Sequence, residues 1–324
     1  MQSAGRLSAG GLSASQVAWI FQLLLEREPS QDEVEARLDR YADVRQVRNE
    51  IIRSPEYVIK NGGNVAYREA QNVFADLAPY GVNGLLYANL SDYIGLSIVN
   101  AQYELEEVAL VRERVKPGYT FVDVGANIGL FTILASDLVW SGGKVFAFEP
   151  VPATLQYLRK SIAANRFCLN VTATQAIVAD RSCDDLEIAY QPIEEGSGSS
   201  GGSFIVDKRD ELPPHLKREA IRAEPLDKLV PEGEKVHFIK VDIEGAEPLA
   251  MKGAERILSA YSPLVMSEVH PAQLKAVSKI DWRGYFDLMK GYGYSPFFFQ
   301  GGEITDEVQH LDDGNVYSVV FAKK

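Results

Sequence analysis

The sequence predicts an α/β protein with a mostly parallel, doubly wound sheet and a small helical domain at the N-terminus. Three observations lead to this prediction. Short apolar segments typical of buried strands alternate with segments of helical periodicity from about residue 116 onward. Only helical spacing occurs from Ser15 to about Lys60, and the chain of 324 residues is longer than an average domain.

The N-terminal part divides into a tail and a helical module. Residues 1–14 are small and polar, which predicts a flexible tail and not a signal peptide. Residues 15–62 predict short amphipathic helices, one of which begins at an N-cap, Ser30, with Glu33 completing a capping box. Gly62-Gly63 then marks a linker, so we place a domain boundary there.

The remaining elements follow in chain order. Residues 63–115 predict a connecting region, a strand or hairpin and then a helix from about Glu104 to Val115, ahead of the main domain of residues 116–324. In that domain we expect strands at 120–124, 144–148, 171–176, 236–241 and 264–268, helices at 129–139, 153–165 and 246–260, and a C-terminal strand pair. Residues 194–203, rich in glycine and serine, predict a flexible loop, either a mobile lid or a tolerated insertion.

Composition excludes several classes of protein. No apolar run reaches the length of a membrane span, so we expect a soluble protein in the cytoplasm. Cys168 and Cys183 are the only cysteines, too few for a zinc motif or a disulfide framework. The formal charge of −12 opposes sequence-independent binding of nucleic acid, which needs a basic surface. We therefore expect no nucleic-acid partner.

The segment FVDVGANIGLF, residues 121–131, predicts a cofactor site at a strand-to-helix turn. Dinucleotide sites have glycine at the middle position of such a turn, where this chain has Asn127, a residue that tolerates positive φ. Asp123, at the end of the strand, would repel a pyrophosphate but could hold an ammonium group. S-adenosylmethionine, which carries an ammonium and a sulfonium and no phosphate, is therefore favoured. The turn residues assigned to this cofactor are Gly125, Ala126, Asn127 and Gly129.

Further candidates for the nucleoside follow the next two strands. Glu149 is placed to accept both ribose hydroxyls, and Pro150 beside it is assigned to the same site. Asp180 either accepts from the adenine amino group or simply forms a turn. A lone D-x-G-x-x-x-G pattern is common by chance, and Glu149 one strand later makes the prediction specific.

Several longer segments point to one family. They are YELEEVALVRERVKPGYTFVDVGANIGLFTILAS, VFAFEPVPATLQYLRKSIAAN, EPLDKLV and FIKVDIEGAEPLAMKGAERIL. Together they resemble the FkbM family of S-adenosylmethionine-dependent methyltransferases, and KVDIEGAE is the most family-specific piece. The resemblance implies a Rossmann-like class I methyltransferase fold, S-adenosylhomocysteine as a product, and O-methylation of a hydroxyl on a sugar, glycan or natural product. It also implies that Glu104 reaches the methionine end of the cofactor; a glutamate stabilised at a helix N-terminus is the alternative.

The N-terminal pattern LLLEREPS…IIRSPEYV resembles a small helical module of the DUF4214 type, often found beside enzymes that build glycans. This resemblance favours a sugar or glycan as the small-molecule partner. Pairing of these helices between subunits would give a homo-oligomer.

Polar residues follow the predicted fourth and fifth strands, at the edge where open α/β sheets bind ligands. The candidates for catalysis are Asp242, Glu244, Glu268 and His270. Asp242 is the first choice for a residue beside the transferred methyl group, where it accepts from the acceptor hydroxyl or the cofactor. Glu244 either acts in the site or caps the next helix, and His270 is either a base or an ordinary loop residue. Glu268 either orients His270 or binds substrate, and Lys240 either pins a carboxylate or faces solvent.

Three alternatives stay open. The same four candidates could hold a divalent metal, which we do not favour because their spacing does not require one. The chain could be an NAD oxidoreductase, which the missing middle glycine and KVDIEGAE oppose, or a protein that binds S-adenosylmethionine without turnover. If the protein is a methyltransferase, the alternative to a hydroxyl acceptor is an amide or amine nitrogen.

Overall fold

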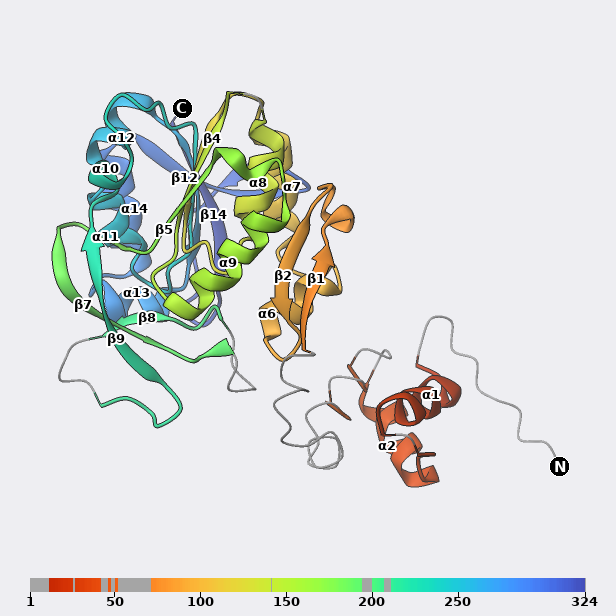
Figure 1. Cartoon of the computed structure of the whole chain (residues 1–324). Coiled ribbons are helices and arrows are strands. Elements are labelled where there is room, and N and C mark those ends of the chain that lie inside the picture. Colours follow the sequence, from red (N-terminus) through yellow and green to blue (C-terminus); the bar gives the residue numbers. More distant parts are fainter. Residues whose placement is uncertain are drawn as a thin grey trace. The chain divides into compact units, whose positions relative to one another are not determined.

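The chain forms two compact units, Met1–Gln71 and Asn72–Lys324 (Figure 1). The computed structural model describes residues 12–25, 27–41, 46–47, 50–51, 71–140, 142–193, 200–206 and 211–323. The boundary predicted at Gly62-Gly63 lies outside the described residues. In the part that is described, no helix combines the length and the apolar character that crossing a membrane requires.

The N-terminal unit has a small core of its own. Helices α1 (Ala14–Leu25) and α2 (Gln31–Arg40) bury Phe21 and its apolar neighbours. The predicted capping box is confirmed: the Glu33 N–H donates to the Ser30 hydroxyl oxygen at 3.2 Å, and the Ser30 N–H donates to the Glu33 carboxylate at 2.8 Å. The start of α2 is thus encoded locally.

The second unit begins with a hairpin and two helices, close to the predicted strand or hairpin and helix. Their bounds are β1 (Asn72–Asp76), the 3₁₀ helix η1 (Ala78–Tyr80), β2 (Leu85–Asn89), α6 (Tyr93–Val99) and α7 (Leu105–Arg114). The strands β1 and β2 pair antiparallel. Helix α6 was not predicted; it is short and begins where Asp92 accepts a hydrogen bond from the Gly95 N–H at 2.9 Å.

A sheet of eight strands in the described residues forms the centre of this unit, in the order β13-β12-β14-β11-β10-β3-β4-β5. The bounds are β3 (Thr120–Val124), β4 (Lys144–Phe148), β5 (Val171–Thr174), β10 (Phe238–Val241), β11 (Leu264–Val269), β12 (Tyr294–Gln300), β13 (Glu303–Glu307) and β14 (Tyr317–Lys323). Strands β11, β10, β3, β4 and β5 pair parallel, whereas β14 pairs antiparallel with both of its neighbours. The prediction of a mostly parallel α/β sheet is confirmed.

Helices cover both faces of this sheet (Figure 1). One face carries α7, α8 (Leu130–Val139) and α9 (Pro152–Ala164), and the other carries α10 (Leu226–Leu229), α11 (Glu247–Lys252), α12 (Glu255–Tyr261) and α14 (Trp282–Gly291). The short α13 (Pro271–Val277) follows β11, and the 3₁₀ helix η2 (Cys168–Asn170) precedes β5. The single helix predicted at 246–260 is wrong, since it breaks at Gly253. A Cβ there would lie 2.0 Å from the Ala179 carbonyl oxygen.

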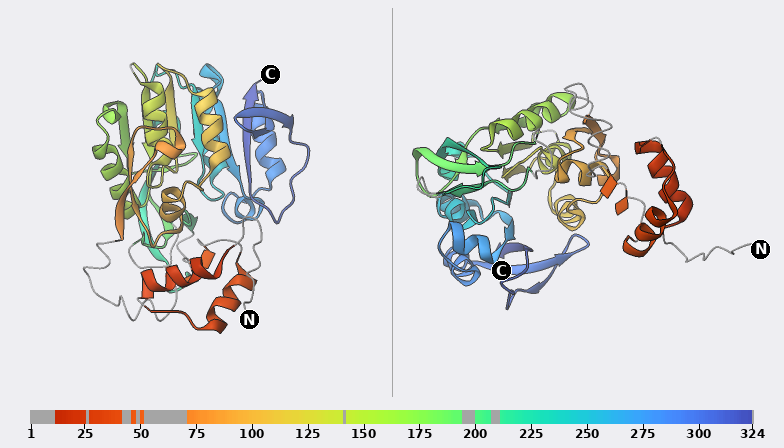
Figure 2. Two further views of the ribbon diagram at one scale, coloured as in Figure 1. Left: turned by 90° about the vertical axis from the view of Figure 1, so that its right-hand side faces the viewer. Right: turned by 90° about the horizontal axis from the view of Figure 1, so that it is seen from below.

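A second, smaller sheet was not predicted. It contains β6 (Ile177–Val178), β7 (Cys183–Tyr190), β8 (Phe204–Val206) and β9 (Lys217–Glu224), in the order β6-β9-β7-β8. The predicted strand 171–176 ends earlier, at Thr174, because Ile177 and Val178 pair with β9 instead of β4. Figures 1 and 2 show the strands of this sheet at the lower end of the main sheet.

Candidate active site

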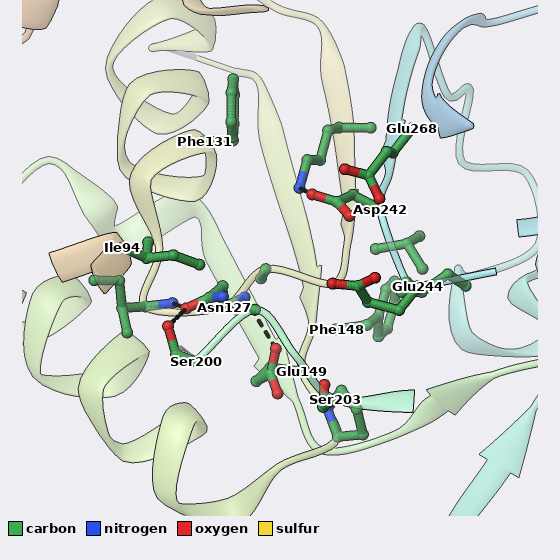
Figure 3. Close-up of a pocket in the computed structure, with 18 of the residues that line it drawn as sticks. Ile94, Asn127, Phe131, Phe148, Glu149, Ser200, Ser203, Asp242, Glu244 and Glu268 are labelled. Atoms are coloured by element: carbon green, nitrogen blue, oxygen red, sulfur yellow. Dashed lines mark hydrogen bonds and ion pairs between the residues drawn. The ribbon is translucent and has the colours of Figure 1, made fainter. Parts of the chain in front are cut away.

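A cavity of about 390 Å³ opens at the carboxyl ends of β3, β4 and β10. The residues on its wall include most of those that the sequence predicts, namely Glu104, Gly125, Ala126, Asn127, Gly129, Glu149, Pro150, Asp242, Glu244 and Glu268. Figure 3 shows Asp242, Glu244 and Glu268 together on one side, while Asn127 and Glu149 lie on the other.

The glycine turn brings two loops into backbone contact. Gly125 has a φ of 81°, and a Cβ on it would lie 2.0 Å from the carbonyl oxygen of Asp242. Asn127 has a φ of 51°, the left-handed conformation that its residue type tolerates. Only glycine fits at residue 125, so the turn after β3 lies directly against the loop after β10.

Glu149 is bound to the turn by hydrogen bonds. Its side chain is buried, with one oxygen accepting from the Val151 N–H and the other from the Asn127 N–H, both at 2.9 Å. Burial raises the pKa of Glu149 to about 7. Each carboxylate oxygen keeps a second lone pair, so Glu149 can still accept from two hydroxyls of a ligand.

An apolar wall that the sequence analysis missed completes this end of the cavity. It is formed by Phe148, Ile177, Ile188, Phe204 and Ile205. Four of the five come from the second sheet, whose pairings link distant parts of the chain, so no local pattern revealed them. An apolar wall beside a carboxylate that accepts hydroxyls suits a nucleoside, with the base against the wall and the ribose at Glu149.

Lys240 is buried and pairs with Asp242, so the pinning alternative holds. Its Nζ lies 3.0 Å from Asp242 Oδ2, and the residue is 6% exposed. Burial opposes its charge, but the carboxylates of Asp242 and Glu104 outweigh burial and raise the pKa of Lys240. Among the described residues of the wall, Lys240 is the only lysine or arginine. A pyrophosphate would therefore find no unpaired cation here, which agrees with a cofactor without phosphates.

Glu244 lies on the wall and does not cap α11, whose N-cap residue is Ala246 and which has no side-chain capping hydrogen bond. Glu247 is buried and accepts from the N–H groups of Ile243 at 2.9 Å and Gly245 at 3.2 Å. Glu244 instead accepts from the side-chain amide of Gln273 at 2.9 Å and has a φ of 53°. Burial and the charge of Asp242 raise the pKa of Glu244 to about 8. A non-glycine residue in this conformation is a feature of functional sites.

Glu104 and Glu268 add two more acids to the same side of the cavity. Glu104 precedes α7 and makes no capping hydrogen bond with its side chain. Burial raises the pKa of both residues the most, and the negative charge of Asp242 raises it further. The acceptor side of the cavity thus holds more carboxyl groups than its one ammonium can neutralise.

Three predicted residues do not lie on the wall. Asp123 is fully buried beneath the turn, where it accepts from the Thr132 hydroxyl at 2.6 Å. Asp180 follows β6 into the second sheet, and its carboxylate lies 3.4 Å from the guanidinium of Arg181. His270 precedes α13, and its buried Nδ1 has no hydrogen-bond partner in the described part of the chain. The arrangement supports neither direct ligand contact by these three side chains nor a base role for His270.

Within the described ranges, no group of three or more His, Cys, Asp and Glu side chains is arranged to hold a metal ion.

The fold and the site together define a class I S-adenosylmethionine-dependent methyltransferase. A model of the methyltransferase FkbM domain matches residues 123–296, and the chain belongs to this family. It is similar to methyltransferase sdnD of Sordaria araneosa, with 26% identity over 200 residues that cover 53% of this chain and 75% of the relative. Methyltransferase 1 of Beauveria bassiana is 25% identical over 154 residues, which cover 41% of this chain and 57% of that protein.

Among solved structures, the FkbM methyltransferase of Methylobacillus flagellatus is 18% identical, with a TM-score of 0.40. The match covers 93% of this chain and 58% of that one, so the chain spans little more than half of that protein.

The acids of the cavity predict how stability depends on pH. The pKa of Glu149 and Glu244 is raised from 4.5 to about 7 and about 8, so the folded state holds protons more tightly than the unfolded state. Their stabilising contribution is present below pH 4.5 and is lost as the pH rises through 7 and 8. We expect the Tm of the ligand-free protein, measured by calorimetry, to fall as the pH rises from 4.5 to about 8.

A matched pair of variants separates this effect from the general repulsion of a chain with net charge −12. Glu268→Gln removes an acid of the cavity, whereas Asp306→Asn removes one exposed carboxylate. Glu268→Gln is expected to flatten the dependence of Tm on pH more than Asp306→Asn does. If Tm falls equally steeply with pH in the two variants, the loss of stability does not come from the acids of the cavity.

Proposed function

We propose that this protein transfers a methyl group from S-adenosylmethionine to a hydroxyl of a sugar, a glycan or a natural product. One observation carries the proposal: a single cavity has a nucleoside side, with the glycine turn and Glu149, and a carboxyl side, with Asp242, Glu244 and Glu268 (Figure 3). A group transfer between a nucleoside cofactor and a polar acceptor needs both sides in one enclosure.

The residues present fit this cofactor. Glu149 would accept the ribose hydroxyls, the apolar wall would hold the adenine, and Glu104 would lie toward the methionine end. The excess of carboxyl groups favours a ligand that carries a sulfonium and an ammonium. When bound, the cofactor supplies a methyl group that its sulfonium has already activated.

Asp242 and Glu244 would have different roles toward the acceptor. The Lys240 ion pair fixes the Asp242 side chain and occupies Oδ2, which leaves Oδ1 for the acceptor hydroxyl. The proton of that hydroxyl leaves as its oxygen takes the methyl group, and a positioned carboxylate assists this step. Glu244, with a pKa of about 8, is largely protonated near neutral pH and can donate to a neighbouring acceptor oxygen.

The N-terminal unit supports the choice of a sugar or glycan. Its resemblance to a DUF4214-type module associates the chain with enzymes that build glycans. We extend the proposal to a cytoplasmic enzyme with a helical module at residues 15–62, and to pairing of that module between subunits. Light scattering of the full chain and of a variant lacking residues 1–71 tests the pairing, which loss of the oligomer in the variant would support.

The proposal is tested with S-adenosylmethionine that carries a deuterated methyl group. The protein is incubated with this donor and with a panel of neutral glycosides, polyketide alcohols and amines. Mass spectrometry is expected to find a trideuteromethyl adduct on a hydroxyl compound. Adducts on amines alone would establish nitrogen transfer instead. Calorimetric binding without any adduct would favour a non-catalytic protein, and absence of binding would overturn the cofactor assignment.

A further inference from the structure

The segment Ser200–Val206, which we call the strap, forms a wall of the cavity that no motif identifies. The first six residues of the strap line the cavity beside the glycine turn. Its C-terminal part is strand β8, in which Phe204 and Ile205 pair with β7. The strap is thus held at that end by the second sheet.

At the other end of the strap, Ser200 makes hydrogen bonds with two other walls of the cavity. Ser200 is 7% exposed, and its N–H donates to Asp92 Oδ1 at 2.8 Å. Its hydroxyl oxygen lies 3.0 Å from Asp92 Oδ2 and 2.8 Å from Asn127 Oδ1. A hydroxyl has one proton, so it donates to one of these oxygens at a time. Because the Ser200 N–H already donates to Asp92, the Ser200 hydroxyl can donate to Asn127 Oδ1.

Asp92 connects the strap to helix α6. It is 1% exposed and, besides Ser200, accepts from the Gly95 N–H at 2.9 Å. Its carboxylate has no ion-pair partner in the described ranges. A buried carboxylate without a cation depends on hydrogen bonds, and Ser200 supplies a large share of them. Helix α6 itself contributes Tyr93, Ile94 and Ile98 to the cavity.

Asn127 connects the strap to the ribose site. Its side chain faces Ser200, as Figure 3 shows, and its backbone N–H donates to Glu149 at 2.9 Å. Three walls of the cavity, namely α6, the glycine turn and the strap, therefore meet at Ser200. Separation of the strap from the other two walls requires the bonds of Ser200 to break.

We propose that Asp92, Ser200 and Asn127 form a clasp that closes the strap over the nucleoside side of the cavity, and that the clasp opens for the cofactor to enter and leave. The proposal rests on the proposed function, because it takes the occupant to be S-adenosylmethionine or S-adenosylhomocysteine. Asp92 and Ser200 are positioning residues in this arrangement, acting through the strap and Asn127. They set how long the cofactor stays bound and take no part in methyl transfer.

Ser200→Ala tests the clasp because it removes only a hydroxyl. Stopped-flow fluorescence is expected to show release of S-adenosylhomocysteine about tenfold faster than from the unchanged protein, the scale of one hydrogen bond to a charged or amide oxygen. The KM for S-adenosylmethionine should rise, while kcat at saturating donor stays unchanged or increases. Ser91→Ala is the matched control, since Ser91 is a neighbouring serine whose hydroxyl bonds Asn89 at 2.5 Å and does not line the cavity.

A second variant tests whether the two residues act as one unit. Asp92→Asn keeps the shape of the side chain, and release rates are compared for each single variant and for the double variant. The clasp predicts that the double variant releases the cofactor more slowly than the product of the two single effects implies. Multiplicative effects, or a release rate for Ser200→Ala equal to that of the unchanged protein, would overturn the clasp. The unchanged protein serves as the reference for the proposed function: if it binds no S-adenosylhomocysteine, the cofactor assignment fails, and if it binds and the variants release at its rate, only the clasp fails.

Discussion

Asp242→Asn is expected to reduce methyl transfer by about a hundredfold or more while the Kd for S-adenosylmethionine changes little. The reason is that, in the proposed function, Asp242 offers Oδ1 to the acceptor hydroxyl, and a positioned base contributes on the order of 10²-fold or more. Asparagine keeps an oxygen near Lys240, whose Nζ lies 3.0 Å from Asp242 Oδ2, so the buried ammonium is not left without an acceptor. Single-turnover kinetics measure the transfer, and calorimetry measures the Kd.

The control for this change is Asp281→Asn, which makes the same exchange at the N-cap of α14, outside the cavity wall. Its turnover is expected to stay close to that of the unchanged protein. Unchanged turnover in Asp242→Asn would remove Asp242 from the mechanism. A Kd that rises in proportion to the lost activity would instead assign Asp242 to the cofactor, the other role that the sequence predicts for it.

Glu149→Gln is expected to weaken binding of S-adenosylmethionine by about a hundredfold, or roughly 3 kcal/mol. Both oxygens of Glu149 accept from backbone N–H groups, those of Val151 and Asn127. A glutamine must place its amide nitrogen against one of these donors, so it disturbs the turn and also loses an acceptor for the ribose. Calorimetric titration of both proteins measures the difference.

Asp180→Asn is the matched variant for the nucleoside side, because Asp180 was predicted to contact adenine but is not on the cavity wall. We expect its Kd to equal that of the unchanged protein. An unaltered Kd in Glu149→Gln would count against the ribose assignment. A weaker Kd in Asp180→Asn would show that the adenine lies elsewhere than against the apolar wall.

The main sheet could be predicted from the sequence because its signals are local. Strands β3 and β4 begin and end at the predicted residues, since each is a short apolar run enclosed on both faces and bounded by turn residues. The glycine turn and Glu149 were found for the same reason: each directly follows one of these runs. The edge of a parallel sheet then brings Asp242 and Glu268 to one cavity.

The rest depends on contacts between distant residues. The second sheet pairs Cys183–Tyr190 with Lys217–Glu224 across a long connection, and neither strand is apolar enough to stand out. The left-handed backbone at Glu244, and the hydrogen bond from the Ile243 N–H to Glu247, are features that residue type alone does not reveal. The bond from Ser200 to Asp92 joins residues 108 positions apart, so no sequence window contains both.

The contact at Gly125 has a consequence for how such an enzyme could diversify. The donor-binding turn and the loop that carries the acids touch through backbone atoms, and β3 and β10 beneath them are in fixed register, with Val124 opposite Val241. In the proposed function, the span between methyl donor and base is therefore set by main-chain geometry and not by any exchangeable side chain. Surrounding segments can be remodelled to admit a different acceptor while this span stays constant, so new substrates need not bring new chemistry.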